Sequence, residues 1–270
     1  MENTKLYKWS GAGNDFVVVD GRGKDVAAFR TPSVISRLCS EHSTDGLMIL
    51  KESVGHDFSM EFYNPDGTGG MMCGNGGRCI AAFAAYLGVT GEHCVFEAPD
   101  GIHTADILSH EKDTLWEVRL GMVDVAGVKE TLGGYFLETG TRHFVKFVPD
   151  VETVDVETEG RLYRMKPEFA PQGSNVNFVS VAPGGLRVRT FEKGVEGETL
   201  ACGTGLTASA IAAFHCGIPP YRTDAAGRVE YHLQACIARL KVDFLPTGED
   251  AFTGVFLTGP AELQGVFDYC

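Results

Sequence analysis

The sequence predicts an α+β fold of two pseudo-symmetric lobes, each a mostly antiparallel sheet wrapped around a central buried helix. Short runs rich in Val, Ile, Leu and Phe recur between turn residues, and several alternate polar and apolar positions as half-buried strands do. Two segments read as helices that are apolar on nearly every side, which is typical of a helix at the centre of a domain. The same two segments repeat one motif, which indicates an internal duplication.

The composition limits the partners. A chain of 270 residues has room for two domains of ordinary size. Its net charge of −13 repels phosphate backbones and anionic lipid, so we expect neither nucleic acid nor a membrane as a partner. The first residues, "MENTKLYKWSGAGNDF", lack a signal-peptide pattern, and no long apolar stretch occurs, so we expect a cytoplasmic protein.

The strands are expected at the apolar runs. In chain order these runs are "DFVVVD", "GLMILKE", "DFSMEFYN", "HCVFEA", "LWEVRL", "RHFVKFV", "NVNFVSV", "LRVRTFE", "ARLKVDFL" and "GVFLTG". A peripheral helix is predicted near residues 32–39, which open with a proline. In a reducing compartment we expect no disulfide framework, and we expect Cys39, Cys94, Cys236 and Cys270 to serve as packing residues.

The two central helices begin in "CGNGGRCIAAFAAYLG" (73–88) and "CGTGLTASAIAAFHCG" (202–217). Gly88 and Gly217 follow their cysteines at the same distance and are predicted to end the helices as C-caps. Upstream, "FYNPDG" and "TFEKGVEGET" form a second matching pair, and "GAGNDFVVV" and "GSNVNFVSV" a third. We therefore expect one lobe at residues 1–123, completed by a C-terminal strand at about 258–270, and the other at 124–257.

A cysteine just ahead of a helix has unusual chemistry. The helix dipole and the unpaired N–H groups of the first turn lower the pKa of such a thiol, and the same N–H groups bind anions. Two facing copies would hold one carboxylate with a sulfur on each side of the adjacent carbon. The hypothesis is a racemase or epimerase in which one sulfur removes the α-proton and the other returns a proton from the opposite face, with no cofactor.

Other chemistries fit less well. Cys73 and Cys79 are six residues apart, outside the spacing of a zinc knuckle, and no metal site is expected. The glycine-rich segments lack the Gly-Lys-Ser/Thr of a phosphate-binding loop.

At these residues the chain resembles diaminopimelate epimerase over nearly its whole length. The resemblance is carried by "KWSGAGNDFVVVD", "YNPDGTGGMMCGNGGRCIAAFA", "GSNVNFV" and "FEKGVEGETLACGTGLTASA". It implies a two-lobed fold and a cytoplasmic, usually dimeric enzyme that interconverts L,L- and meso-diaminopimelate in lysine and peptidoglycan-precursor synthesis, without pyridoxal phosphate or metal.

The resemblance also implies the site residues. Cys73 and Cys202 would be the two bases, with His143 and Glu192 beside them as further catalytic residues. The backbone N–H groups of Gly74, Asn75, Gly203 and Thr204 would bind the α-carboxylate. The remaining substrate-binding positions would be Asn14, Asn64, Asn175 and Lys193.

Two departures from the family pattern concern the distal end of the substrate. The family's Glu-Arg-Gly reads "EKG" here, so Lys193 replaces an arginine that would bind the distal carboxylate as a two-pronged donor. The family's Gly-Asn-Pro-His reads "GTRH", so Thr141 replaces a substrate-facing asparagine and Arg142 replaces a proline. Two alternatives stay open: a related amino-acid racemase with another side-chain specificity, and a catalytically silent anion-binding protein of the same fold.

Overall fold

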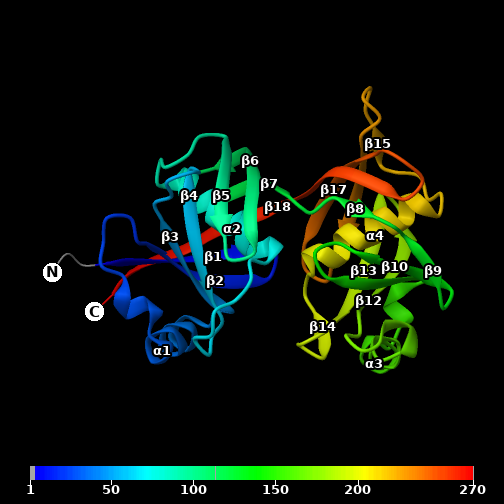
Figure 1. Ribbon diagram of the computed structural model, residues 1–270, viewed down its shortest axis with the longest axis horizontal. Coiled ribbons are helices and arrows are strands. Elements are labelled where there is room, and N and C mark those ends of the chain that lie inside the picture. Colours follow the sequence, from blue (N-terminus) through cyan, green and yellow to red (C-terminus); the bar gives the residue numbers. More distant parts are fainter. Residues whose placement is uncertain (1–3, 113, 270) are drawn as a thin grey trace. The chain divides into compact units, whose positions relative to one another are not determined.

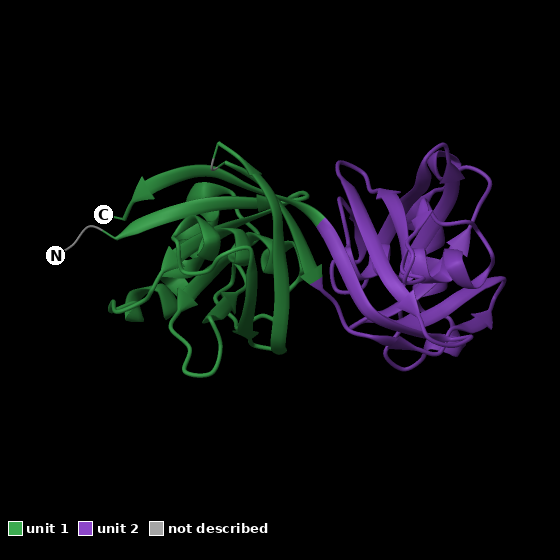
Figure 2. Ribbon diagram, turned by 90° about the horizontal axis from the view of Figure 1, so that it is seen from above, with its two compact units in different colours: residues 1–120, 259–270 green, residues 121–258 purple. Residues whose placement is uncertain are grey.

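The computed structural model describes residues 4–112 and 114–269, so Cys270 lies outside the described residues. The chain divides into two compact units, coloured separately in Figure 2. Unit 1 comprises Met1–Leu120 with Gly259–Cys270, and unit 2 comprises Gly121–Thr258. The boundaries expected from the sequence lie after residues 123 and 257.

Unit 1 is a sheet that closes on itself around a helix. Its strands are β1 (Lys5–Gly11), β2 (Asn14–Asp20), β3 (Gly46–Lys51), β4 (Phe58–Tyr63), β5 (His93–Ala98), β6 (Gly101–Glu111), β7 (Leu115–Gly121) and the last part of β18 (Ala251–Asp268). Each strand pairs with the next along the chain, β7 pairs with β18, and β18 pairs back with β1. The closed sheet therefore leaves α2 (Gly74–Tyr86) at its centre, as Figure 1 shows.

Unit 2 repeats the same order. Its strands are β8 (Val125–Ala126), β9 (Lys129–Thr131), β10 (Gly134–Glu138), β11 (Arg142–Phe147), β12 (Asn175–Ala182), β13 (Gly185–Glu192), β14 (Gly197–Thr199), β15 (Arg222–Thr223), β16 (Val229–Gln234), β17 (Arg239–Pro246) and the first part of β18. The main path of pairing runs β10, β11, β12, β13, β16, β17, β18, β8. It surrounds α4 (Gly203–His215).

The parallel pairs mark the repeat most clearly. Parallel neighbours need a crossover, and here each crossover contains a helix. In unit 1, α1 (Pro32–His42) joins β2 to β3 and α2 joins β4 to β5. In unit 2, α3 (Val156–Arg164) joins β11 to β12 and α4 joins β13 to β16. The predicted α+β fold with two similar lobes, each built around a central helix, is confirmed.

One expectation about the repeat needs correction, and one helix was not predicted. The segments "GAGNDFVVV" and "GSNVNFVSV" do not correspond, because β2 enters the first crossover of unit 1 whereas β12 leaves the first crossover of unit 2. Helix α3 is absent from the predicted elements. The local signals were present: Asp155 caps the helix by accepting from Thr158 N at 3.1 Å, with acidic residues in the first turn and arginines in the last.

The predicted strands and helices otherwise stand where their patterns place them. Each of the apolar runs lies in a strand, and the proline-led segment forms α1. Cys39 and Cys94 are buried as expected, but Cys236 is exposed. It lies in the turn between β16 and β17, and its sulfur donates to Glu198 Oε1 at 3.4 Å.

Both central helices are held by packing on all sides. Every residue of α2 from Asn75 to Ala84 is buried, and the Phe83 ring lies 4.8 Å from the Tyr7 ring and 6.2 Å from the Trp9 ring. In α4, the Phe214 ring meets Phe244 and Phe252 edge-on. Such ring pairs each add about 0.5–1.5 kcal/mol beyond area burial.

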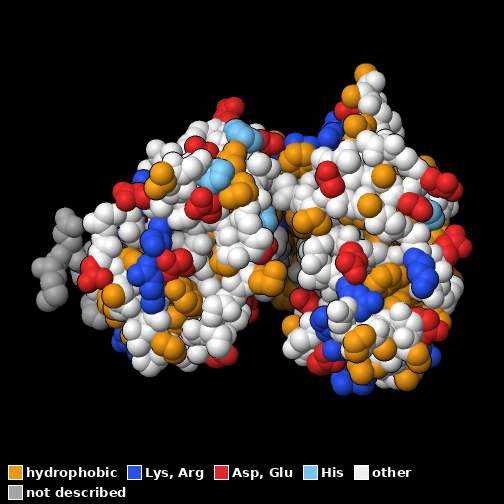
Figure 3. Space-filling view, in the orientation of Figure 1, with side chains coloured by type: hydrophobic (Ala, Val, Ile, Leu, Met, Phe, Trp, Pro, Cys, Tyr) orange, Lys and Arg blue, Asp and Glu red, His pale blue; other side chains and the backbone are white. Residues whose placement is uncertain are grey.

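Charged side chains of both signs lie on the surface. On the face drawn in Figure 3, acidic and basic side chains are interspersed over both units. Among the described residues, no helix has both the length and the apolar composition that crossing a membrane requires.

Both central helices end in the same glycine-dependent cap. Val89 N donates to Ala84 O and Gly88 N donates to Ala85 O, and these are the two hydrogen bonds of a Schellman motif. Ile218 N and Gly217 N repeat these bonds at the end of α4. Gly88 and Gly217 have φ of +67° and +80°, where a Cβ is strained although nothing lies within 4 Å of it.

We predict that Gly88→Ala and Gly217→Ala each lower the free energy of unfolding by about 1 kcal/mol, because alanine must adopt the left-handed conformation. Urea denaturation measures the change. Gly91→Ala is the matched control: its Cβ also meets open space, without positive φ, and we expect no loss. Equal effects at Gly88 and Gly91 would contradict this explanation.

Candidate active site

Both predicted cysteines are the N-cap residues of the central helices. Cys73 has extended backbone angles, and its sulfur accepts from Gly76 N at 3.3 Å. Cys202 caps α4 with a similar extended backbone, and its sulfur lies 3.5 Å from Thr204 Oγ1. The Cys73 side chain is exposed, whereas Cys202 is buried. Each cysteine thus lies beside the N–H groups of a first helical turn, as the sequence predicts.

The glycines after the cysteines are required by close packing. A Cβ on Gly77 would lie 2.8 Å from Leu120 Cδ2 and from Met72 Sδ. A Cβ on Gly205 would lie 2.3 Å from Asn177 Oδ1. Neither position has room for a side chain, so glycine lets each helix start directly against its neighbours.

In unit 1, the predicted residues Asn14 and Asn75 meet in a chain of side-chain hydrogen bonds. Asn75 Nδ2 donates to Asn14 Oδ1 at 2.6 Å, and Asn14 Nδ2 donates to Asp45 Oδ2 at 3.2 Å. At the other end, Arg78 Nη2 donates to Asn75 Oδ1 at 2.8 Å. The two amides are therefore fixed in orientation between a carboxylate and a guanidinium.

Gly74 and Asn64 complete the predicted set in unit 1. Gly74 is the first residue of α2, and its carbonyl oxygen accepts from Arg78 Nη1 at 3.2 Å. Asn64 lies in the loop after β4, where its Nδ2 donates to Thr68 Oγ1 at 3.1 Å. The contacts of Asn64 stay within this loop, which leads on to the cysteine.

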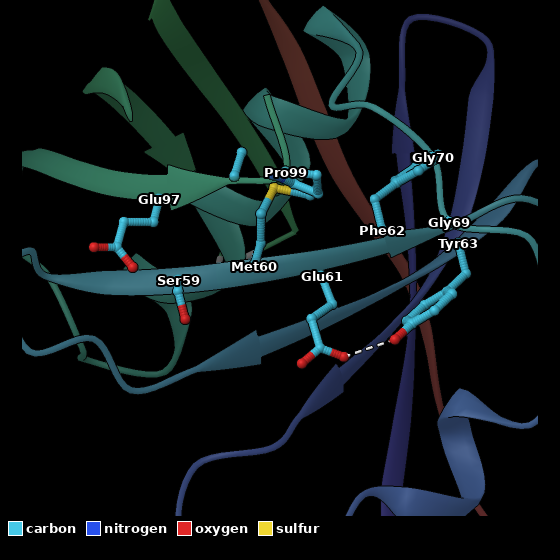
Figure 4. A pocket seen from close by; sticks show the side chains of 10 residues that line it. Ser59, Met60, Glu61, Phe62, Tyr63, Gly69, Gly70, Glu97 and Pro99 are labelled. Carbon is cyan, nitrogen blue, oxygen red and sulfur yellow. Dashed lines mark hydrogen bonds between the residues drawn. The ribbon is translucent and has the colours of Figure 1, made fainter. Parts of the chain in front are cut away.

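A cavity of about 410 Å³ opens beside the same loop (Figure 4). It is lined by Ser59, Met60, Glu61, Phe62, Tyr63, Gly69, Gly70, Glu97, Ala98 and Pro99. Its floor is β4, and the dashed line in Figure 4 joins Tyr63 Oη to Glu61 Oε2 at 2.9 Å. Cys73 does not line it, so this cavity is not the cysteine site.

In unit 2, the predicted residues Thr204 and His143 lie together with Cys202. His143 Nε2 is 2.9 Å from Thr204 Oγ1 and 2.9 Å from Thr141 Oγ1. Thr139 Oγ1 donates to Thr204 O at 2.9 Å, which fixes the first turn of α4. The connection from His143 to the Cys202 sulfur runs through the Thr204 hydroxyl.

The hydrogen bonds of His143 indicate which ring nitrogen carries the proton. Asn177 Nδ2 donates to the Phe144 carbonyl, so it is also the donor toward His143 Nδ1 at 3.0 Å. An Nδ1 that accepts leaves the proton of the neutral ring on Nε2. Complete burial lowers the pKa of His143 to about 3, so the ring is neutral at physiological pH.

The other predicted residues of unit 2 lie at the ends of neighbouring strands. Asn175 Nδ2 donates to Arg142 O at 3.0 Å, and Asn175 Oδ1 accepts from Lys193 N at 2.8 Å. Glu192 is the last residue of β13, and partial burial raises its pKa. The Lys193 side chain that follows it is exposed. Gly203 begins α4 as Gly74 begins α2.

The Arg142 side chain makes its contacts within unit 2. Its Nη1 donates to Phe169 O and to Gln172 Oε1, both at 2.9 Å, and its guanidinium lies 4.9 Å from the centre of the Phe136 ring. These contacts hold its head group against the segment after α3.

Three residues of the site were not predicted: Arg78 and Asp45 in the group around Asn14 and Asn75, and Asn177 beside His143. Arg78 carries a recognisable signal, because it is a charged residue within an otherwise apolar helix. Asn177 shares a strand face with Asn175, two residues before it, as the period of a strand dictates. In the described residues, no group of three or more His, Cys, Asp or Glu side chains is placed to hold a metal ion.

Comparison with known proteins gives one family. The sequence model described as "Diaminopimelate epimerase" matches residues 6–125 and 135–232. A protein named diaminopimelate epimerase from Flavobacterium psychrophilum is 38% identical over 262 residues, covering 96% of this chain and 97% of its own. Another of that name, from Chlorobaculum tepidum, is 40% identical over 220 residues, covering 77% and 82%.

A solved structure shares the fold at low identity. The phenazine biosynthesis protein of the PhzF family from Bacillus anthracis superposes with a TM-score of 0.73 at 14% identity, covering 100% of both chains. The likeness at this identity concerns the fold alone.

The burial of His143 gives a prediction about pH. Below about pH 6.5 the unfolded chain takes up a proton on this histidine, whereas the folded protein does not. The contribution of the neutral histidine to the unfolding free energy is therefore full above that pH and is lost as the pH decreases toward 3. Between pH 7 and pH 5 this group costs the wild type about 2 kcal/mol of unfolding free energy. Between pH 7 and pH 5 we therefore expect His143→Gln to lose about 2 kcal/mol less unfolding free energy than the wild type loses. Urea denaturation at both pH values measures the difference. The same loss in both proteins would contradict the prediction.

Proposed function

The chain belongs to the diaminopimelate epimerase family, and from this membership we propose that it interconverts L,L- and meso-diaminopimelate with two cysteines and no cofactor. The observation that carries the proposal is the cysteine N-cap of the buried helix in each of two similar units. A two-base inversion needs an acid and a base that approach one carbon from opposite faces. A duplicated unit with one cysteine per copy supplies such a pair.

The proposed reaction moves one proton at a time. One cysteine, as thiolate, takes the α-proton, so an S–H bond forms as the Cα–H bond breaks. The electron pair spreads into the α-carboxylate, where N–H groups of Gly74, Asn75, Gly203 and Thr204 stabilise the added charge. The other cysteine, as thiol, then gives its proton to the opposite face of the carbon and becomes the thiolate.

His143 is proposed as a positioning residue. Its neutral ring donates from Nε2 toward Thr204, so that the Thr204 hydroxyl is able to donate its own proton to the Cys202 sulfur, 3.5 Å away. A ring that is already neutral and fully buried is a poor place to store the proton of a thiol. Its proposed role is to orient Thr204, which in turn stabilises the thiolate form of Cys202.

Glu192 and the asparagines are proposed to bind the polar groups of the substrate. Burial raises the pKa of Glu192, and an α-ammonium group placed beside it would lower that pKa and stabilise the carboxylate form. Asn64 and Asn175 are proposed to contact the distal amino-acid group, and Asn14 to hold Asn75 in place.

Lys193 is proposed to bind the distal carboxylate. Its side chain is exposed at the end of β13, whereas the Arg142 head group is occupied by Phe169 O and Gln172. Replacement of the family arginine by Lys193 also favours the second candidate function, a racemase of the same chemistry acting on another side chain. A panel of amino acids distinguishes the two functions.

The cellular setting is proposed from the family as well. We propose a cytoplasmic homodimer that acts on a free small-molecule amino acid. Light scattering at two protein concentrations tests the dimer.

The proposal predicts that Cys73→Ser and Cys202→Ser each lower kcat/KM for conversion of L,L- to meso-diaminopimelate by at least about a hundredfold, because a hydroxyl cannot replace the thiol as acid or base near neutral pH. Chiral chromatography of the products measures the rate. Cys236→Ser, at an exposed sulfur outside both clusters, is the control and keeps full activity. Full activity in either of the first two variants would refute the two-base assignment. A folded wild type that binds the substrate without converting it would favour the silent binding protein.

For Lys193, we predict that Lys193→Met raises KM for diaminopimelate about tenfold with little change in kcat, since the bond to the distal carboxylate is made equally in the ground and transition states. Lys193→Arg keeps KM within a few-fold. Lys129→Met, which removes an exposed lysine on β9, serves as the charge-matched control. A Lys193→Met enzyme with the KM of the wild type would rule out this contact.

A further inference from the structure

We propose that Arg78 is a positioning residue of the unit 1 half-site, whose buried guanidinium stabilises the thiolate form of Cys73 and makes Cys73 the thiolate of the resting enzyme. The inference rests on the proposed function in one respect, that Cys73 acts as a base. It adds that the two cysteines differ in charge state before substrate binds, and it names the residue responsible.

The guanidinium is held inside the protein by neutral partners. Arg78 is 0% exposed. Its Nη1 donates to Gly74 O at 3.2 Å, its Nη2 to Asn75 Oδ1 at 2.8 Å and its Nε to Pro260 O at 3.3 Å. Burial lowers the pKa of Arg78 to about 10, so it stays charged at neutral pH. In the described part of the chain no carboxylate contacts this guanidinium, and a buried charge in that situation is costly and calls for an anion nearby.

The position within the helix makes this charge harder to explain by structure alone. Arg78 lies near the N-terminal end of α2, where the helix dipole already presents positive charge and disfavours a cation. Unit 2 makes the same backbone contact without a charge: Thr207, five residues after Cys202 as Arg78 is after Cys73, donates from Oγ1 to Gly203 O at 3.0 Å. Holding the first turn therefore does not require a guanidinium.

Cys73 is the anion that fits this charge. It is the N-cap of the helix that carries Arg78, and the positive charge of Arg78 and the negative charge of a Cys73 thiolate attract each other. The sulfur also accepts from Gly76 N at 3.3 Å. A thiolate at this place receives both the N–H groups of the first turn and the buried guanidinium.

The other ionisable groups around Cys73 do not replace Arg78. Cys79 is fully buried, and burial raises its pKa, so it is a neutral thiol. Asp15 on β2 pairs with Lys8 on β1 at 3.0 Å. Asp45 accepts from Asn14 Nδ2 and from Asp15 N, at the far end of the amide chain. The asparagines between Asp45 and Arg78 orient the guanidinium while keeping the carboxylate away from it.

The described contacts of Cys202 are of a different kind. Thr204 is a neutral hydroxyl, and His143 behind it is a neutral ring. The half-sites therefore differ in a defined way: a buried cation serves Cys73, and a hydroxyl backed by an imidazole serves Cys202.

The test measures the ionisation of the two cysteines directly. The full-length reduced protein is alkylated with iodoacetamide between pH 5.5 and 9.5, and the modification of Cys73 and Cys202 is followed separately by peptide mass spectrometry. We expect a lower pH midpoint for Cys73 than for Cys202 in the wild type. In Arg78→Met the Cys73 midpoint rises by about one pH unit or more, and the Cys202 midpoint stays unchanged. Arg78→Lys, which keeps the charge, restores most of the wild-type midpoint.

Several results would overturn the proposal. A folded Arg78→Met protein with an unshifted Cys73 midpoint would do so, as would equal midpoints for the two cysteines in the wild type. The second comparison needs no variant and holds even if Arg78→Met does not fold. Thr207→Val controls for the loss of the backbone contact alone and is expected to leave both midpoints in place. Because alkylation requires no turnover, this result is separate from any failure of the proposed epimerase activity, and in an active enzyme the acidic limb of the kcat/KM profile shifts with the Cys73 midpoint.

Discussion

The burial of an apolar helix inside each closed sheet determines where the reactive end of that helix lies. Because α2 and α4 are enclosed along their length, their first turns are fixed by the surrounding strands rather than by the loops before them. The cysteine N-caps and the glycines that follow inherit this rigidity, and Gly77 and Gly205 have no room for a side chain. Site geometry at a helix N-terminus thus depends on core packing around the helix.

The two units share their order of strands and crossovers but have diverged in the groups that support each cysteine. Unit 1 places Arg78 and two asparagines beneath the first turn of its helix, and unit 2 places His143 and Asn177 there. The repeated fold supplies two equivalent positions for sulfur. The supporting residues then make the positions chemically different, which suits a reaction in which one sulfur begins as base and the other as acid.

The sequence predicted what local patterns encode and missed what distant contacts decide. Strand alternation, the cysteine-glycine starts and the glycine ends of the helices are read within a few residues, and the structure has them at those places. The pairing of Thr204 with His143, 61 residues away in the chain, and the direction of Arg142 depend on how strands are brought together. The capping residues of α3 can be recognised in the sequence, but the helix they cap is short and contains a glycine.

The central claim is that two bases serve opposite faces of one carbon, and isotope exchange tests it most directly. The reduced enzyme is incubated with L,L-diaminopimelate in D₂O, and the reaction is stopped at low conversion. The account predicts deuterium at the α-carbon of the meso product and almost none in the remaining L,L substrate, since the thiol that protonates the new face carries solvent deuterium while the thiolate holds the abstracted proton. Deuterium entering the L,L pool as fast as the product would contradict it and indicate a single base.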